Sequence, residues 1–262
     1  MNTIQSSIVS AMMLAGVVAC GNATTRTSDT KIVGGDRVSA SEAIAKSTVA
    51  LVTPYGEAFC SGSLIAPRVV LTASHCVAEY DEDTLYVAFG LVAKPGSIKK
   101  ANVREASNYV HNEDYDPSAM DDAPATRPPN DVAIVTLEEA APSGYVPVKM
   151  LTLDDDIHAG ETLTLAGFGL TSAEGDDSGV LRKVDVKMTS VDKASEEIEF
   201  GDTPGKSACM GDSGGPAFLE RDGQLRLIGV TSRGSSECDS DGIYTDVRYF
   251  QNWINQTEKA NL

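Results

Sequence analysis

Short apolar runs rich in β-branched residues recur from residue 32 onward, and they constrain the fold more than any other feature of the chain. Val, Ile, Thr and Leu dominate the runs, and turn residues separate them. Examples are STVALVT, SGSLIAPRVVLTA, TLYVAFGL, DVAIVTL, ETLTLAGFGL, VLRKVDVKMTSV, QLRLIGVTS and GIYTDV. Since no helical segments alternate with these runs, they predict an all-β sandwich or barrel and not a parallel α/β sheet.

Three segments depart from this β pattern. Residues 248–259 place Tyr249 and Trp253 at helical spacing, which predicts an amphipathic C-terminal helix that docks on the barrel. Residues 112–130 and 174–178 are rich in turn-forming polar residues, and we expect both segments to be loops.

Residues 1–20 are predicted to be an export signal. Their apolar run, Ile8 to Ala19, is too short to span a membrane. The run Val17-Val18-Ala19-Cys20 resembles the bacterial lipobox, in which the cysteine is lipidated and becomes the mature N-terminus. Cleavage by an ordinary signal peptidase, without lipid, is the alternative. Both predict export to the cell envelope, the periplasm or the exterior, where disulfides can form.

Charge and cysteine spacing exclude several classes of function. The net charge is −17, so nucleic acid and anionic lipid headgroups are not expected partners, and a membrane contact would need the N-terminal lipid. No cysteine spacing fits a zinc site, and neither a metal nor a cofactor is expected. Four of the five cysteines can form two disulfides, and Cys20 is the odd one. The five are Cys20, Cys60, Cys76, Cys209 and Cys238.

The hexapeptide GDSGGP, residues 211–216, is the most informative motif. A serine hydroxyl is a poor nucleophile unless a base removes its proton and nearby donors stabilise the resulting oxyanion. Glycines on both sides of Ser213 let the backbone turn sharply and approach a substrate carbonyl. The amide groups of Gly211 and Ser213 could then point at one oxygen. A Gly-rich turn between strands is the simpler alternative.

A histidine and an aspartate each stand at the end of an apolar run. His75 follows VVLTA and precedes Cys76, and a disulfide from Cys76 to Cys60, one hairpin earlier, would fix its position. The other two histidines, His111 and His158, lie in polar contexts typical of the surface. Asp131 opens the run DVAIVTL, where a buried carboxylate needs hydrogen bonds. An imidazole N–H can supply one.

Taken together, these residues resemble the trypsin/chymotrypsin family of serine proteases. The matching motifs follow in the family's order: IVGG at residues 32–35, TASHC, DVAIVTL, AGFG at residues 166–169, GDSGGP, GIYTDV and the Trp253 helix. The resemblance implies a peptidase domain over 32–262, built from two packed antiparallel β-barrels at about 32–145 and 146–262, with a C-terminal helix. It also implies a monomeric endopeptidase that cleaves proteins or peptides through an acyl-enzyme, with protein inhibitors as potential partners.

The resemblance assigns roles to individual residues. Ser213 would be the nucleophile, His75 the general base and Asp131 the residue that orients the base. The amides of Gly211 and Ser213 would form the oxyanion hole. A second disulfide, Cys209–Cys238, would tie the nucleophile loop to the wall of the specificity pocket.

The resemblance also implies a zymogen. Residues 21–31 would be an activation propeptide, and cleavage after Lys31 would free an ammonium group on Ile32 that pairs with the carboxylate of Asp212. That ion pair would order the oxyanion loop.

The specificity pocket departs from the family pattern. Ser207 stands where trypsins carry an aspartate, so cleavage after basic residues is not implied, and another trypsin-like protease is expected to cut Lys31–Ile32. A neutral pocket base with glycine at Gly242 resembles the chymotrypsin-like arrangement, which accepts large apolar side chains. Arg233 either reaches into the pocket, where it would favour acidic or small residues, or points to solvent, the alternative we favour. We align Ser232 with the position at which the family carries a tryptophan. The smaller side chain predicts a more open substrate-binding edge. The residues assigned to the pocket are Ser207, Thr231, Arg233, Gly234 and Gly242.

Two other functions fit part of the sequence. A catalytically silent, protease-like binding module is one, although such chains normally lose a triad residue and this chain keeps all three. An esterase with a Ser nucleophile is the other, but its GxSxG elbow belongs to an α/β fold, and here a strand-like PAFLE follows the serine.

Overall fold

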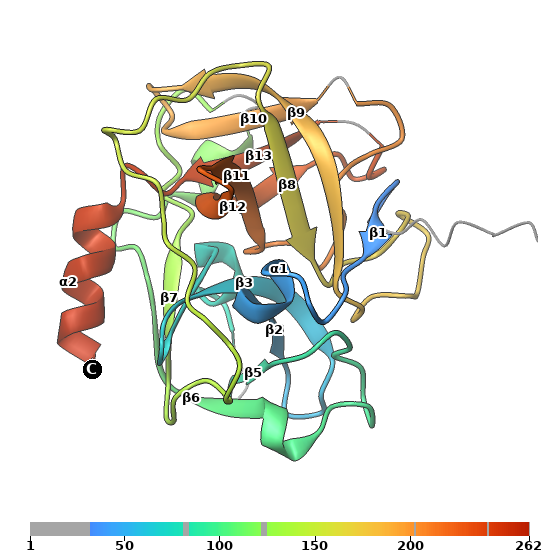
Figure 1. Cartoon of the computed structure of the whole chain (residues 1–262). Helices are drawn as coiled ribbons and strands as arrows, with labels where there is room; N and C mark the ends of the chain where they lie inside the picture. Colours follow the sequence, from blue (N-terminus) through green and yellow to red (C-terminus); the bar gives the residue numbers. More distant parts are fainter. Residues whose placement is uncertain (1–31, 81–83, 122–124, 202, 240, 262) are drawn as a thin grey trace, which may run out of the picture.

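The computed structural model describes residues 32–80, 84–121, 125–201, 203–239 and 241–261. It contains two antiparallel β-barrels packed against each other, with one longer helix at the C-terminus (Figure 1). The all-β, two-barrel prediction and the C-terminal helix are therefore confirmed. Among the described residues, no helix has the length and apolar character needed to cross a membrane.

The first barrel closes in the order β2-β3-β4-β7-β6-β5. Its strands are β2 (Thr48–Val52), β3 (Ala58–Ala66), β4 (Val69–Thr72), β5 (Tyr86–Ala88), β6 (Val103–His111) and β7 (Ala133–Leu137). β2, β4 and β7 are buried along their whole length, which explains why they are nearly continuous apolar runs in the sequence. β6 is mostly half-buried or exposed and polar, so its sequence shows no clear β pattern, and we did not predict it.

The second barrel is formed by β8-β9-β10-β13-β12-β11, because β8 pairs with both β9 and β11. Its strands are β8 (Thr162–Gly167), β9 (Arg182–Asp192), β10 (Glu197–Gly201), β11 (Pro216–Arg221), β12 (Gln224–Gly234) and β13 (Gly242–Asp246). A short β1 (Asp36–Arg37) pairs with the first two residues of β9. β10 also lacked a clear signal, since its five residues EIEFG alternate glutamates with apolar residues, and we did not predict it.

The helices are few and short. α1 (Ile44–Ser47) and the 3₁₀ turns η1 (Ser74–Cys76), η2 (Lys100–Asn102) and η3 (Pro117–Asp121) connect strands. η3 lies within the predicted loop of residues 112–130. α2 (Gln251–Asn261) lies beside β7 and buries Ile254 completely, so its apolar face docks on a barrel as predicted (Figure 1).

Candidate active site

His75 and Asp131 meet because of the register between two neighbouring strands. β4 and β7 are antiparallel and pair Thr72 with Ala133, so the end of β4 and the start of β7 share one edge of the first barrel. His75 lies in η1 just after β4, and Asp131 lies two residues before β7. His75 Nδ1 is 2.8 Å from Asp131 Oδ2, and the His75 amide donates to Asp131 Oδ1 at 3.0 Å.

The local electrostatics suit a base held in one orientation. Burial of the His75 ring opposes its charged form, but the hydrogen bond and the negative charge of Asp131 outweigh burial and raise the pKa of the imidazole above its usual value. The Asp131 side chain is fully buried, whereas that of His75 is 26% exposed. Because Nδ1 faces the carboxylate, its proton is held there and Nε2 is the nitrogen turned to other partners.

Two hydroxyl groups of the second barrel hold Asp131 from the other side. Ser232 Oγ on β12 donates to Asp131 Oδ2 at 2.7 Å, and Thr245 Oγ1 on β13 donates to the Asp131 carbonyl at 3.0 Å. Ser232 is buried, so it is not the open edge position that we predicted.

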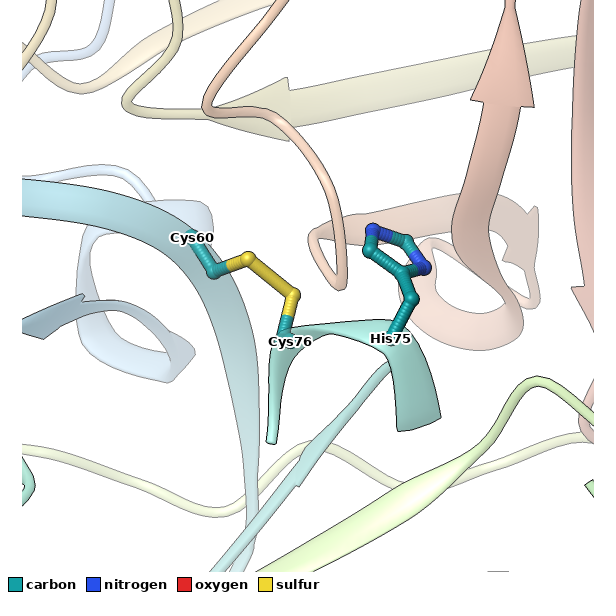
Figure 2. Close-up of side chains that lie close together, drawn as sticks. All are labelled: Cys60, His75 and Cys76. Atoms are coloured by element: carbon teal, nitrogen blue, oxygen red, sulfur yellow. A yellow bond between two sulfur atoms is a disulfide. The ribbon is translucent and has the colours of Figure 1, made fainter. Parts of the chain in front are cut away.

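A disulfide fixes the segment that carries His75. Cys76 follows His75 in η1 and is bonded to Cys60 on the neighbouring strand β3 (Figure 2). Among the described residues, Cys60, Cys76 and His75 form the one group of three potential metal ligands, but the bonded sulfurs have no thiolate to offer. The second disulfide joins Cys209 to Cys238. Both pairings are those expected from the sequence.

The Ser213 loop is held against the first barrel by its glycines. A Cβ on Gly214, which has φ +76°, would lie 2.1 Å from Thr72 Oγ1 and 2.5 Å from the Ser61 carbonyl. A Cβ on Gly215 would lie 2.7 Å from the Ala166 carbonyl. The Ser61 amide donates to the Ser213 carbonyl at 2.8 Å. These close approaches explain why GDSGGP has glycines at these two positions, and they weigh against a simple turn.

The direction of the Gly211 N–H follows from the orientation of the peptide group between Met210 and Gly211. The Met210 carbonyl accepts the Leu170 N–H at 2.9 Å, and a planar trans peptide directs the Gly211 N–H the opposite way. Gly211 has φ +92°, which favours glycine. Its own carbonyl accepts the Ser61 hydroxyl at 2.9 Å. The loop that carries the two predicted oxyanion donors is therefore fixed on both sides of Gly211.

Asp212 is buried, and amide groups bind both of its carboxylate oxygens. Gly169 N–H donates to Oδ1 at 2.8 Å and Cys209 N–H donates to Oδ2 at 2.9 Å. Burial raises the pKa of Asp212 to about 6, although these two amides and the charge of Arg182 act in the opposite direction. A Cβ on Gly167 or Gly169 would overlap the Asp212 carboxylate, which accounts for both glycines of the AGFG motif.

The segment after the predicted activation site packs into the second barrel. In this uncut chain Ile32 is buried in the core of that barrel. The Val33 carbonyl accepts the Ser207 N–H at 3.2 Å, and a Cβ on Gly34 would overlap the Gly205 carbonyl. The structure thus places IVGG beside the predicted base of the pocket. Cys20 and residues 1–31 lie outside the described residues.

The predicted pocket residues share one cavity with Ser213. Its volume is about 240 Å³, and Ser207, Thr231, Arg233, Gly234 and Gly242 line it together with Ser213. Ser207 is buried and its hydroxyl donates to the neighbouring Ala208 carbonyl at 2.9 Å. The structure therefore brings the five residues together around the candidate nucleophile.

Arg233 does not point to solvent, which corrects the alternative that we favoured. Its side chain is 13% exposed, and its guanidinium makes two contacts with the carboxylate of Glu197, at 2.5 and 3.1 Å. Glu197 lies on β10 and its side chain is 1% exposed. The charge of Arg233 is thus compensated inside the wall of the cavity. A buried carboxylate requires such a partner, and this requirement overrides the tendency of long basic side chains to reach water.

Sequence reasoning missed three residues that support the site. Ser61 follows Cys60 in an ordinary strand, Ser232 was considered only for the substrate-binding edge, and Glu197 lies in a strand that was not predicted. None of the three had a clear sequence signal, because each acts on a partner that is distant along the chain. His111 is exposed and the His158 side chain is 66% exposed, as expected of surface histidines.

Comparisons with known proteins agree with this geometry. The family model described as Trypsin matches residues 32–254. A trypsin of Saccharopolyspora erythraea is 34% identical over 216 residues, which cover 76% of this chain and 87% of the relative. Glucanase inhibitor protein 2 of Phytophthora infestans is 33% identical over 219 residues, covering 78% and 80%. A trypsin of Phaedon cochleariae is 31% identical over 217 residues, covering 76% and 78%. The chain therefore belongs to the trypsin/chymotrypsin-like family of serine proteases.

Proposed function

We propose that the chain is a serine endopeptidase with Ser213 as its nucleophile. The observation that carries the proposal is the chain of hydrogen bonds from Ser232 through the buried Asp131 to His75, next to a cavity lined by Ser213. A carboxylate that orients an imidazole, with a serine close by, is the arrangement that activates a hydroxyl for acyl transfer.

The reaction runs in two halves. Ser213 Oγ attacks the substrate carbonyl while its proton passes to His75 Nε2, and the amides of Gly211 and Ser213 stabilise the oxyanion. His75 then gives the proton to the leaving amine, and an acyl-enzyme remains on Ser213. Water then attacks the acyl carbonyl and gives a proton to His75. His75 passes this proton to Ser213 Oγ as the bond to the acyl group breaks, which releases the acid and restores the serine. Asp131 stays ionised throughout and stabilises the charged imidazole.

Activation follows from cleavage after Lys31. The new ammonium group on Ile32 would pair with Asp212, whose raised pKa indicates that its buried charge is undercompensated in the uncut chain. Because the Ser207 pocket has no carboxylate at its base, the enzyme would not cut after Lys31 itself, and a separate trypsin-like protease would do so. Efficient activation of the pure uncut chain would contradict this proposal.

The cavity favours uncharged side chains before the cleaved bond. Ser207 brings no charge, and the charge of Arg233 is paired with Glu197. The substrate backbone would lie along residues 232–234 of β12, because the pairing of β12 with β11 ends at Val230. The two disulfides fit an extracellular protein, and we propose that the chain is exported, with Cys20 as a candidate lipid attachment site.

A binding module without activity is the second candidate. One relative has the name Glucanase inhibitor protein 2, which describes inhibition and not hydrolysis. A peptide library incubated with the chain cut after Lys31, beside its Ser213→Ala variant, distinguishes the two functions. Cleavage by the first protein alone supports the protease, and after Phe, Tyr or Leu it also supports the neutral pocket. No cleavage, with Ile32 at a free N-terminus, supports the binding module.

A further inference from the structure

Arg233 lines the same cavity as Ser213, and it forms an ion pair with Glu197. Ser232 and Arg233 are successive residues of β12, and their side chains go to different partners. Ser232 binds Asp131, whereas Arg233 binds Glu197 on β10. The substrate would lie along β12. This strand therefore supports the candidate base through Ser232 and forms an ion pair through the next residue, Arg233.

Three features make the pair a fixed part of the cavity wall. The contact is bidentate, which fixes the plane of the guanidinium as well as its position. The carboxylate is almost completely buried, so it cannot release Arg233 without leaving an uncompensated charge. Glu197 Oε2 also accepts the Ala125 N–H at 3.4 Å, in the segment that leads to Asp131. The pair thus joins β12, β10 and a loop of the first barrel.

The ion pair changes which charges the cavity offers to a substrate. An arginine in the wall of a substrate cavity is a ready partner for a carboxylate, but Glu197 already occupies that role. The rest of the chain is strongly acidic, with a net charge of −17, so it offers acidic substrates no other attraction.

We propose that Glu197 is a specificity-determining residue: by masking the charge of Arg233, it makes the protease select uncharged over acidic side chains before the cleaved bond. This inference rests on the proposed function for its meaning, but binding measurements test it separately. Arg233 is a latent anion site, and Glu197 decides whether that site is available.

The test compares three variants with the parent, all in a Ser213→Ala background and all cut after Lys31. Peptides carry Gln or Glu, which have nearly the same shape, at each of the three positions before the cleavable bond. Their dissociation constants are measured by calorimetry. Glu197→Gln should shift the preference toward Glu by about tenfold, as expected of a newly available charged hydrogen bond. Arg233→Gln should shift it toward Gln, because Glu197 then stands unpaired. The double variant should return close to the parent.

A matched control is Glu161→Gln, which removes the partner of Arg221 in an ion pair outside the cavity. It should leave the Gln/Glu preference unchanged. If Glu197→Gln fails to fold, the parent still decides the question: a masked Arg233 predicts no preference for Glu, whereas an available Arg233 predicts a preference for Glu that Arg233→Gln abolishes. Equal preference in all variants overturns the inference, as does failure of every peptide to bind the parent. The same peptides given to the cut chain with Ser213 intact report on hydrolysis, so loss of the proposed function would be seen independently.

Discussion

Ser61 of the first barrel donates its hydroxyl to the carbonyl of Gly211 in the second, at 2.9 Å. Ser61 Oγ also accepts a hydrogen bond from the Phe168 N–H at 3.0 Å, and the Ser61 N–H donates to the Ser213 carbonyl. One fully buried residue of β3 therefore connects the first barrel to both the nucleophile loop and the AGFG segment. This contact helps to fix the position of Ser213 in the second barrel relative to His75 in the first.

Replacing Ser61 by Ala should lower both stability and turnover. The change removes a hydrogen bond to Gly211 and leaves the buried Phe168 N–H without its acceptor, which costs about 1–3 kcal/mol of unfolding free energy. We expect kcat to fall with little change in KM, because the oxyanion loop is affected more than the pocket. Thermal unfolding and steady-state kinetics measure the two effects.

Ser63 provides the matched control on the same strand. It is equally buried, but its hydroxyl has no hydrogen-bond partner among the described residues. Ser63→Ala should therefore leave kcat unchanged and should not lower the melting temperature. Equal losses in the two variants would show that Ser61 acts through packing alone.

The pH profile of kcat/KM should follow His75. Its pKa lies above the usual value, and only the neutral ring can accept the Ser213 proton, so activity should fall as the pH drops through that raised pKa. Asp131→Asn removes the hydrogen bond and the charge that raise the pKa, and burial of the ring then acts alone. The midpoint should move to lower pH, and kcat should drop by about 10⁴-fold, the loss found for this change in serine proteases with the same triad. Asp156→Asn, at a side chain that is 92% exposed, should change neither.

Cleavage after Lys31 should change how stability depends on pH. In the uncut chain the pKa of Asp212 is about 6, above its ordinary value of 3.8. Between these values the folded state binds more protons than the unfolded state, so this group's contribution to stability falls as the pH rises from about 4 to about 6. An ammonium group on Ile32 would lower the pKa of Asp212 and reduce that loss. Melting temperatures of cut and uncut protein at pH 4 and pH 7 measure the difference, and identical profiles would argue against the ion pair.

Gly169→Ala should disrupt the same region sterically. The new Cβ would lie 2.6 Å from the carboxylate carbon of Asp212, a distance that requires the surrounding backbone to shift. Overpacking of this kind costs about 1–3 kcal/mol. We expect a lower melting temperature and a large loss of activity in the cut enzyme. Full activity would mean that the position of Asp212 is not critical.

Much of the fold could be predicted because the strands buried on both faces are continuous apolar runs, as in β4 and β7. β6 could not, since its exposed positions carry polar residues. β10 could not either, because it is short and its buried Glu197 owes its place to Arg233, a partner distant in the sequence. The GDSGGP and AGFG motifs could be identified from the sequence for a related reason. Their glycines lie where a Cβ would collide with Thr72 or Asp212, so the constraint is local and is visible in the sequence.

The environment of Arg233 could not be inferred in the same way. Its partner Glu197 is 36 residues away along the chain, on a strand with weak β character. From the sequence, the general preference of arginine for water decided between the two alternatives for Arg233. The buried carboxylate that reverses this preference becomes apparent once β10 and β12 are placed on either side of β13.

Covalent labelling tests the central proposal most directly. The chain cut after Lys31 is treated with a fluorophosphonate, which reacts with activated serines, and the adduct is located by mass spectrometry. The account predicts a single adduct on Ser213, formed much more slowly in the uncut chain and absent from His75→Ala. A correctly cut and folded protein that gains no adduct, or gains it at another serine, would contradict the assignment of Ser213 as nucleophile.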